Sequence, residues 1–267
     1  MKILFVGDIV GGPGRKAVAN LLPHLIEKAG GFDAIIVNAE NAAGGKGLTQ
    51  SVLDEILDLE VDVITTGNHV WDNRDIFRFI DTEPNLVRPA NFPKGTPGRG
   101  WLVATAASGT RIGVMNIAGQ LYMDSYENPF HTFDAILPQI EARTRFILLD
   151  FHAEATAEKI AMGWYVDGKV SAIVGTHTHV QTADEQILPQ GTAYITDVGM
   201  TGPHDSVIGM KKEEVIERFR TMLPRRYQVA GGDIILCGVI LELDDETGKA
   251  LSIQRIRLPM SDVVKAQ

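Results

Sequence analysis

The chain has 267 residues, of which 45% are hydrophobic and 22% are charged, a length and composition typical of one globular domain. We therefore expect a single domain that spans residues 1–267. The formal net charge of -9 argues against a long nucleic-acid partner, because duplex binding relies on clustered Lys and Arg that displace counterions. An acidic chain can still act on a phosphate ester if bound dications supply the positive field locally.

The single cysteine and the short apolar runs limit the kinds of site and compartment. Cys237 lies inside the apolar run 234–241, so one chain can build neither a disulfide framework nor a thiolate metal site, and we expect a plain core residue. Residues 2–6 are too few for the core of a signal peptide, and no apolar run reaches membrane-spanning length. We expect a cytoplasmic protein without a membrane partner.

Strands and helices alternate along the chain as far as residue 222. Short β-branched or apolar runs predict buried strands, and the stretches between them carry apolar residues at helical spacing. In chain order the pattern predicts strand 3–6, helix 17–28, strand 34–37, helix 51–59, strands 61–65 and 111–117, helix 133–142, strand 146–149, helix 154–162, strands 171–174 and 193–195, and helix 211–222. This alternation indicates a largely buried sheet covered by helices.

Toward its end, from residue 227, the chain changes to consecutive strands. Residues 227–230, 233–243 and 251–257 are separated by a Gly-Gly pair and by the turn at residues 244–248. Turn residues between apolar runs are typical of an antiparallel meander. We therefore expect these strands to complete the sheets. No repeat or linker divides the chain.

Polar residues follow five of the predicted strands at the point where each strand ends. In chain order these residues are Asp8, then Glu40 and Asn41, then Asn68 and His69, then His152, and finally His177 and His179. The carboxyl ends of parallel strands meet at one edge of a sheet, so we expect these side chains to converge. A mixture of imidazole and oxygen ligands suits first-row dications rather than calcium. The sequence therefore predicts a metal site at this edge.

Each of these residues also has a structural explanation when taken alone. An Asp after a strand is commonly a helix cap or a turn residue, Asn38 and Asn41 could be turn residues, and His69 could be a partly buried structural histidine. The structural explanation is weaker for His177 and His179, because alternation along an extended segment puts both rings on the same side. A purely structural explanation of the whole set is therefore the less favoured one.

Other motifs give weaker signals. The run Gly11-Gly-Pro-Gly14 has neither the dinucleotide-binding spacing nor a phosphate-loop Lys, and neither Ser108 nor Ser206 has the surroundings of a serine nucleophile. His24 lies in a predicted helix. His131 and His204 lie in predicted loops with no assigned role, although His204 could line the site.

The strand-end residues together resemble the calcineurin-like metallophosphoesterase superfamily, and more closely its YmdB-type bacterial branch of cyclic-nucleotide phosphodiesterases. The motifs that carry the resemblance are Gly7-Asp8, Asn38-Ala-Glu40-Asn41, Gly67-Asn68-His69, His152 and Gly175-Thr-His177-Thr-His179. The resemblance implies an α/β fold (α+β in some schemes), built as a four-layer α/β/β/α sandwich with two mixed sheets between helices.

The resemblance also implies a role for each residue. Asp8, Asn41 and His179 would hold one metal ion, Asn68, His152 and His177 would hold the other, and Glu40 would bridge both, with His69 as the proton donor. The superfamily usually has Asp-x-His where this chain has Asp8-Ile-Val10, and Asn41 can replace the missing ligand. Val70 and Trp71 separate His69 from the next acidic residue, Asp72. Whether Asp72 orients His69 is therefore left open.

The predicted activity is that of a dinuclear-metal phosphodiesterase. Two ions about 3.5–4 Å apart can hold a bridging hydroxide that attacks phosphorus, while His69 protonates the leaving oxygen. We expect two divalent or mixed-valence ions per chain, iron or manganese, with zinc as an alternative. Small phosphodiesters are the expected substrates, and the resemblance favours 2′,3′-cyclic nucleotides.

Two other functions stay open: a phosphomonoesterase, and a metal-dependent nucleotide-binding regulator. They differ in what they do to a phosphoester, because a monoesterase releases inorganic phosphate and a regulator binds without turnover. A homo-oligomer is expected only because compact cytoplasmic enzymes commonly form symmetric assemblies.

Overall fold

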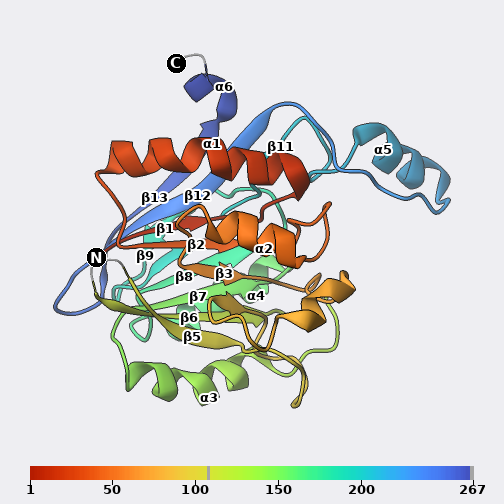
Figure 1. The fold of residues 1–267 in the computed structure, drawn as a ribbon. Coiled ribbons are helices and arrows are strands. Elements are labelled where there is room, and N and C mark those ends of the chain that lie inside the picture. Colours follow the sequence, from red (N-terminus) through yellow and green to blue (C-terminus); the bar gives the residue numbers. More distant parts are fainter. Residues whose placement is uncertain (107–108, 265–267) are drawn as a thin grey trace.

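Two mixed β-sheets stack face to face, and helices cover both outer faces (Figure 1). The computed structural model describes residues 1–106 and 109–264. Within these residues the first sheet has seven strands, in the order β11 (Gly202–Pro203), β12 (Ile234–Leu243), β1 (Lys2–Val6), β2 (Ala34–Asn38), β3 (Val63–Thr65) and β4 (Leu86–Val87), with β13 (Ala250–Pro259) paired to β12. The second sheet has six, in the order β5 (Trp101–Thr105), β6 (Arg111–Ala118), β7 (Ile147–His152), β8 (Ala172–Thr176), β10 (Ala193–Ile195) and β9 (Gln186–Ile187).

The centre of each sheet is parallel. Strands β1 to β4 run parallel to one another, as do β6, β7, β8 and β10, whereas β12 pairs antiparallel with β1 and with β13. Parallel strands bring their carboxyl ends to one edge of the sheet. The residues that follow β1, β2, β3, β7 and β8 are therefore placed at a common edge.

Six α-helices and one 3₁₀ helix are described. They are α1 (Gly11–Ala29), α2 (Gln50–Leu57), the 3₁₀ helix η1 (Arg74–Arg78), α3 (Pro129–Glu141), α4 (Thr156–Val166), α5 (Lys212–Thr221) and α6 (Met260–Val264). Helix α1 buries Val18, Leu21 and Leu25 at helical spacing and ends at Gly30, whose φ of 72° is left-handed. Helix α5 stands away from the two sheets (Figure 1).

Three apolar clusters separate the four layers. The first joins α1 and α2 to the outer face of the first sheet, through residues such as Leu4 and Leu21. The second lies between the sheets, where Phe5 and Val114 are buried. The third joins α3 and α4 to the second sheet, through residues such as Phe133. The predicted fold class, two mixed sheets between helices, is confirmed; the assignment of residues 1–267 to one domain stays a prediction.

The structure corrects several predicted elements. Residues 227–230 do not form a strand, since only Val229 makes an isolated bridge, to Met210, and the segment has no neighbouring strand to pair with. The strands β4, β9 and β11 have two residues each, which is too short for a hydrophobic pattern to be recognised. Cys237 is a free, fully buried thiol as expected. Among the described residues, no helix is long and apolar enough to span a bilayer.

A buried ion pair fixes the segment that follows β8. Lys159 of α4 and Asp197 are each 1% exposed, and the Nζ atom lies 2.7 Å from Oδ2 of the carboxylate. The ammonium group also donates to the carbonyl oxygen of Thr176 at 2.7 Å. The same carboxylate oxygen accepts from the backbone nitrogen and the hydroxyl of Thr178, at 3.1 and 2.8 Å. The pair therefore holds the chain on both sides of His177.

We expect the substitution Lys159→Met to lower the free energy of unfolding by about 3–5 kcal/mol, because it leaves Asp197 charged and buried without its partner. Urea unfolding followed by circular dichroism measures the change. The matched control is Lys212→Met, which removes an exposed partner of Asp205 and should have a much smaller effect. Equal effects of the two substitutions would show that the buried pair does not stabilise this part of the fold.

Candidate functional site

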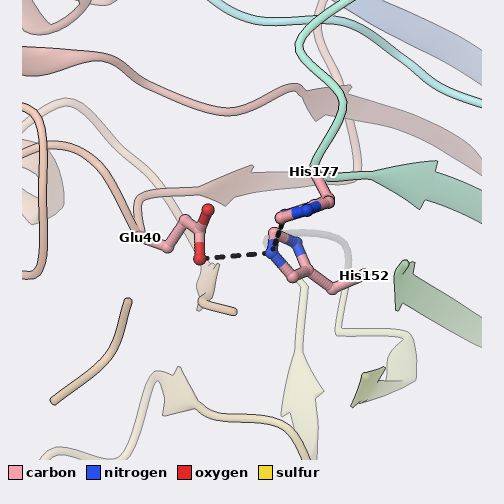
Figure 2. A group of neighbouring side chains, drawn as sticks. All are labelled: Glu40, His152 and His177. Atoms are coloured by element: carbon pink, nitrogen blue, oxygen red, sulfur yellow. Dashed lines mark hydrogen bonds and ion pairs between the residues drawn. The ribbon is translucent and has the colours of Figure 1, made fainter. Parts of the chain in front are cut away.

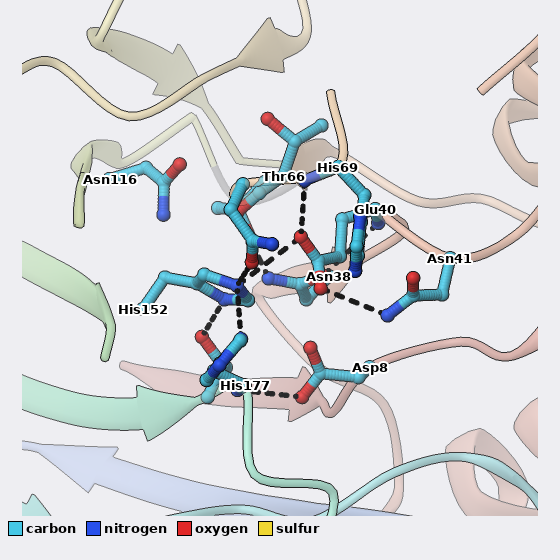
Figure 3. Close-up of polar contacts among 12 residues, drawn as sticks. Asp8, Asn38, Glu40, Asn41, Thr66, His69, Asn116, His152 and His177 are labelled. Carbon is cyan, nitrogen blue, oxygen red and sulfur yellow. Dashed lines mark hydrogen bonds and ion pairs between the residues drawn. The ribbon is translucent and has the colours of Figure 1, made fainter. Parts of the chain in front are cut away.

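The polar residues that follow five strands lie together at the carboxyl edge of the two sheets (Figure 3). They follow or end β1, β2 and β3 of the first sheet and β7 and β8 of the second. Hydrogen bonds and ion pairs join them into one connected group, whose members are Asp8, Glu40, Asn41, Asn68, His69, His152, His177 and His179. The structure thus brings together every residue that the sequence predicts for the site.

The carboxylate of Glu40 lies at the centre of this group. Its Oε2 atom is 3.2 Å from Nε2 of His152, and its Oε1 atom accepts from the Asn41 amide at 2.9 Å. Within the described residues, Glu40 belongs to two sets of donor atoms that lie within 4.8 Å of one another: one with His152 and His177 (Figure 2), the other with Asp8 and His179. One carboxylate shared by two adjacent sets is the arrangement that a bridging ligand requires.

Two imidazole rings meet beside Glu40. Nε2 of His152 lies 3.1 Å from Nδ1 of His177 and 2.9 Å from the side-chain oxygen of Asn68. Figure 2 shows both rings turned toward the Glu40 carboxylate. Two ring nitrogens, an amide oxygen and a carboxylate oxygen therefore point into one small space, and this mixture of atoms is suited to a transition-metal dication.

Charge coupling inside the site shifts the pKa values of its members. Burial opposes ionisation of Glu40, but the neighbouring His152 outweighs it and holds the Glu40 pKa below its usual value. Burial would also lower the pKa of His152, yet Glu40 and then Asp8 raise it to about 9. Burial and the charge of His152 lower the pKa of His177 to about 3. At neutral pH a cation that binds His152 therefore has to displace a proton.

Asp8 has a buried oxygen without a hydrogen-bonding partner. Its Oδ2 atom accepts from the backbone nitrogen of His177 at 3.3 Å, whereas Oδ1 has no partner among the described residues. Burial raises the Asp8 pKa to about 7. A buried carboxylate oxygen left unpaired costs free energy, and a bound cation would recover it. The residues present therefore fit the metal ions that the family resemblance implies.

A chain of hydrogen bonds behind His152 fixes its ring. The Nδ1 atom lies 2.8 Å from the hydroxyl of Thr176, which donates to Oδ1 of Asp150 at 2.7 Å. The other oxygen of Asp150 accepts from Thr65 at 2.5 Å and from Asn38 at 3.1 Å. This arrangement engages Nδ1 of His152 in a hydrogen bond and directs Nε2 into the site. Hydrogen-bonding partners behind metal-binding histidines commonly have this effect.

Sequence reasoning gave Asp150 no role, although the residue directly follows the strand predicted at 146–149; in the structure β7 continues to His152, and Asp150 lies inside it. The signal that could have found it is its position two residues before His152, since alternation puts both side chains on the same face of the strand. An aspartate in a fully buried strand requires hydrogen-bonding partners.

The backbone around the site is tightly constrained. A Cβ atom on Gly67 would lie 2.2 Å from Oε2 of Glu40 and 2.3 Å from Nε2 of His152, so a side chain at this position would fill the site. His177 and His179 have φ angles of 98° and 65°, a left-handed conformation that costs non-glycine residues about 1–3 kcal/mol each. The expected extended segment is therefore wrong: β8 ends at Thr176, and the two rings enter different sets of donor atoms. The strained segment is the one that the Lys159–Asp197 ion pair holds.

The structure resolves the open question about Asp72. Its Oδ2 atom lies 3.0 Å from Nδ1 of His69, and Lys46 approaches the same oxygen at 3.4 Å. The side chain of His69 is 24% exposed, and its backbone nitrogen donates to Oε2 of Glu40. Asp72 therefore orients the ring through Nδ1 and leaves Nε2 available to a molecule that enters from solvent.

The remaining histidines lie elsewhere. His24 is half-buried on α1, and His131 is exposed in the first turn of α3. Neither belongs to the two sets of donor atoms. His204 lines a cavity of about 650 Å³ whose wall also includes His179, so it lies near the site without joining it.

Known proteins resemble this chain over almost its whole length. The model of the YmdB-like protein family matches residues 4–256. A Bacillus subtilis (strain 168) protein named 2′,3′-cyclic-nucleotide 2′-phosphodiesterase is 53% identical over 256 residues, which cover 96% of each chain.

Two solved structures have the same fold. A hypothetical protein from Thermus thermophilus has a TM-score of 0.90 at 37% identity, covering 97% of this chain and 99% of its own. A protein described as a novel phosphatase from Mycoplasma pneumoniae has a TM-score of 0.91 at 35% identity, covering 99% and 96%. The matched length and identity confirm the predicted resemblance and the prediction of a phosphoric diester hydrolase. The chain belongs to the YmdB-like protein family.

Proposed function

We propose that this protein hydrolyses small phosphodiesters with two metal ions, and that 2′,3′-cyclic nucleotides are its substrates. The observation that carries the proposal is the buried Glu40 carboxylate, which belongs to two adjacent sets of ligand atoms. The name of the Bacillus subtilis relative, a 2′,3′-cyclic-nucleotide 2′-phosphodiesterase, supports the substrate class.

The proposed ligands divide between two ions. Asp8, Asn41 and His179 bind one, Asn68, His152 and His177 bind the other, and Glu40 bridges them. The contacts of Glu40 with His152 and Asn41, one from each set, support this division. Iron or manganese is the proposed metal, with zinc as an alternative, because all three accept nitrogen and oxygen ligands.

The side chains divide the chemical work in this proposal. When bound, the two ions supply a nucleophile from water at neutral pH and neutralise the charge on the phosphoryl oxygens. His69 donates a proton to the leaving oxygen from Nε2, while Asp72 holds its ring by Nδ1 at 3.0 Å. Asp150 keeps the His152 ring aligned through Thr176. A cytoplasmic location, the lack of a long nucleic-acid partner and a homo-oligomeric state stay predictions from the sequence.

We expect His69→Ala to lower kcat for 2′,3′-cyclic AMP by about 100- to 10,000-fold, which corresponds to about 3–5 kcal/mol of transition-state stabilisation. Metal content should stay at the wild-type level, because the ring is assigned to neither ion. The assay follows nucleotide monophosphate by chromatography, with His131→Ala as the control for an exposed histidine. An unchanged kcat would remove His69 as the proton donor. Release of inorganic phosphate from a nucleotide monophosphate at a comparable rate would favour a phosphomonoesterase.

The substitution Glu40→Ala should reduce bound metal as well as turnover, since both ions lose a shared ligand. Metal content per chain is measured by plasma mass spectrometry after reconstitution and gel filtration. His69→Ala serves as the comparison, because it should lose activity and keep its metal. A Glu40→Ala protein that retains two ions per chain would contradict the bridging role.

Metal affinity should fall as the pH is lowered from 9 to 6. In the metal-free protein the pKa of His152 is about 9, so below that pH each binding event displaces its proton. The Asp8 pKa of about 7 adds a second displaced proton at lower pH. We expect the dissociation constant for Mn²⁺ to rise about tenfold per pH unit near pH 8, and more steeply below pH 7. A chelator competition series measures it, and a flat profile would contradict the proton competition.

A further inference from the structure

A cavity whose wall includes two arginines adjoins the proposed metal site. It has a volume of about 650 Å³, and its wall includes His179, His204, Arg255 and Arg257. The Nδ1 atom of His179 is occupied by the carbonyl oxygen of Ile208 at 2.9 Å, whereas Nε2 faces Asn41 at 3.1 Å. The ring of His179 therefore borders both the metal-binding atoms and the cavity.

Strand pairing places the two arginines at this edge. In β13 they are two residues apart, so alternation directs both side chains to the same face of the sheet. Arg257 pairs with Cys237 of β12, whose carbonyl oxygen accepts from the backbone nitrogen of Gly7, the residue before Asp8. Arg257, Cys237 and Gly7 therefore lie side by side across three neighbouring backbone segments. Neighbouring strands are about 4.8 Å apart, so the backbone of Arg257 lies about 10 Å from that of Gly7.

The two arginines differ in their hydrogen bonds and ion pairs with the rest of the described chain. Arg255 donates to the carbonyl oxygen of Thr182 at 3.0 Å and lies 3.4 Å from Oε1 of Glu185. The exposed guanidinium of Arg257 makes no hydrogen bond or ion pair with the described part of the chain. The guanidinium N–H groups of Arg257 are therefore available to bind a ligand.

No acidic residue is among the described residues that line this cavity. Glu185 lies 3.4 Å from Arg255, and Asp205 and Asp233 line a neighbouring cavity that shares His204 and Arg257. Asp205 is already paired with Lys212 at 2.5 Å. Glu185 offsets the charge of Arg255, so the guanidinium of Arg257 is the group that favours an anion in this cavity.

We propose that this cavity binds a second phosphate group of the substrate, the 5′-phosphate of a nucleoside 2′,3′-cyclic phosphate. The inference rests on the proposed function, because the cyclic diester has to occupy the metal site. The 5′ oxygen lies at the end of the ribose opposite the cyclic diester, so a phosphate there extends away from the metals. A guanidinium with free donors binds phosphate through paired, charge-assisted hydrogen bonds.

The test compares kcat/KM for adenosine 2′,3′-cyclic phosphate with and without a 5′-phosphate. In the metal-loaded wild-type protein the 5′-phosphate should raise kcat/KM about 10- to 100-fold, the effect of one charge-assisted hydrogen bond. In Arg257→Gln this ratio should fall to near one. Arg220→Gln removes an exposed charge from α5 and should keep the wild-type ratio. A wild-type ratio of one, or a ratio that survives in Arg257→Gln, would overturn the proposal.

A binding measurement separates this inference from the proposed function. Calorimetry compares adenosine 3′,5′-bisphosphate with adenosine 3′-monophosphate, neither of which is a cyclic diester. Tighter binding of the bisphosphate that Arg257→Gln abolishes would support the second phosphate site even if no cyclic nucleotide is hydrolysed. Equal affinities of the two nucleotides for the wild-type protein, or a preference for the bisphosphate that Arg257→Gln retains, would overturn the assignment.

Discussion

The buried carboxylate of Glu40 is the interaction on which the rest of the site depends. A charge removed from water is tolerated only when donors or cations surround it. Here an imidazole, an amide and a backbone nitrogen contact its two oxygens, and each comes from a different strand end. The two sheets must therefore hold their carboxyl edges in register, and Gly67 must leave the space beside Glu40 unfilled.

Sequence reasoning could predict the fold class and the site because both follow from local signals. Buried strands such as 34–37 appear as unbroken apolar runs, and the polar residue after each run marks the edge where parallel strands end. His177 and His179 are the strongest signal, since two histidines at alternate positions have few structural uses. The four layers came from the family resemblance, because pattern alone does not count sheets.

The contacts that the sequence did not reveal are those between residues far apart in the chain. Asp150 is 85 positions from Thr65, and Lys159 is 38 positions from Asp197, so neither pairing leaves a local pattern. The prediction of a strand at residues 227–230 was wrong for a related reason. A strand needs a neighbouring strand to pair with, and its own sequence does not specify that neighbour. Asp72 could not be assigned because its approach to His69 depends on the turn between them.

The choice of neutral ligands affects which substrates the site favours. On the proposed assignment the donors include two carboxylates, Asp8 and Glu40, and the other five side chains are neutral when they bind metal. Two dications would bring four positive charges, so about one would remain after the two carboxylates and one hydroxide are counted, and bound metals are often the largest charges in a site. On that assignment the excess would attract an anionic phosphodiester to a chain whose net charge is -9. On this assignment Asn41 and Asn68 would supply ligand atoms to the metal ions without adding negative charge to the site.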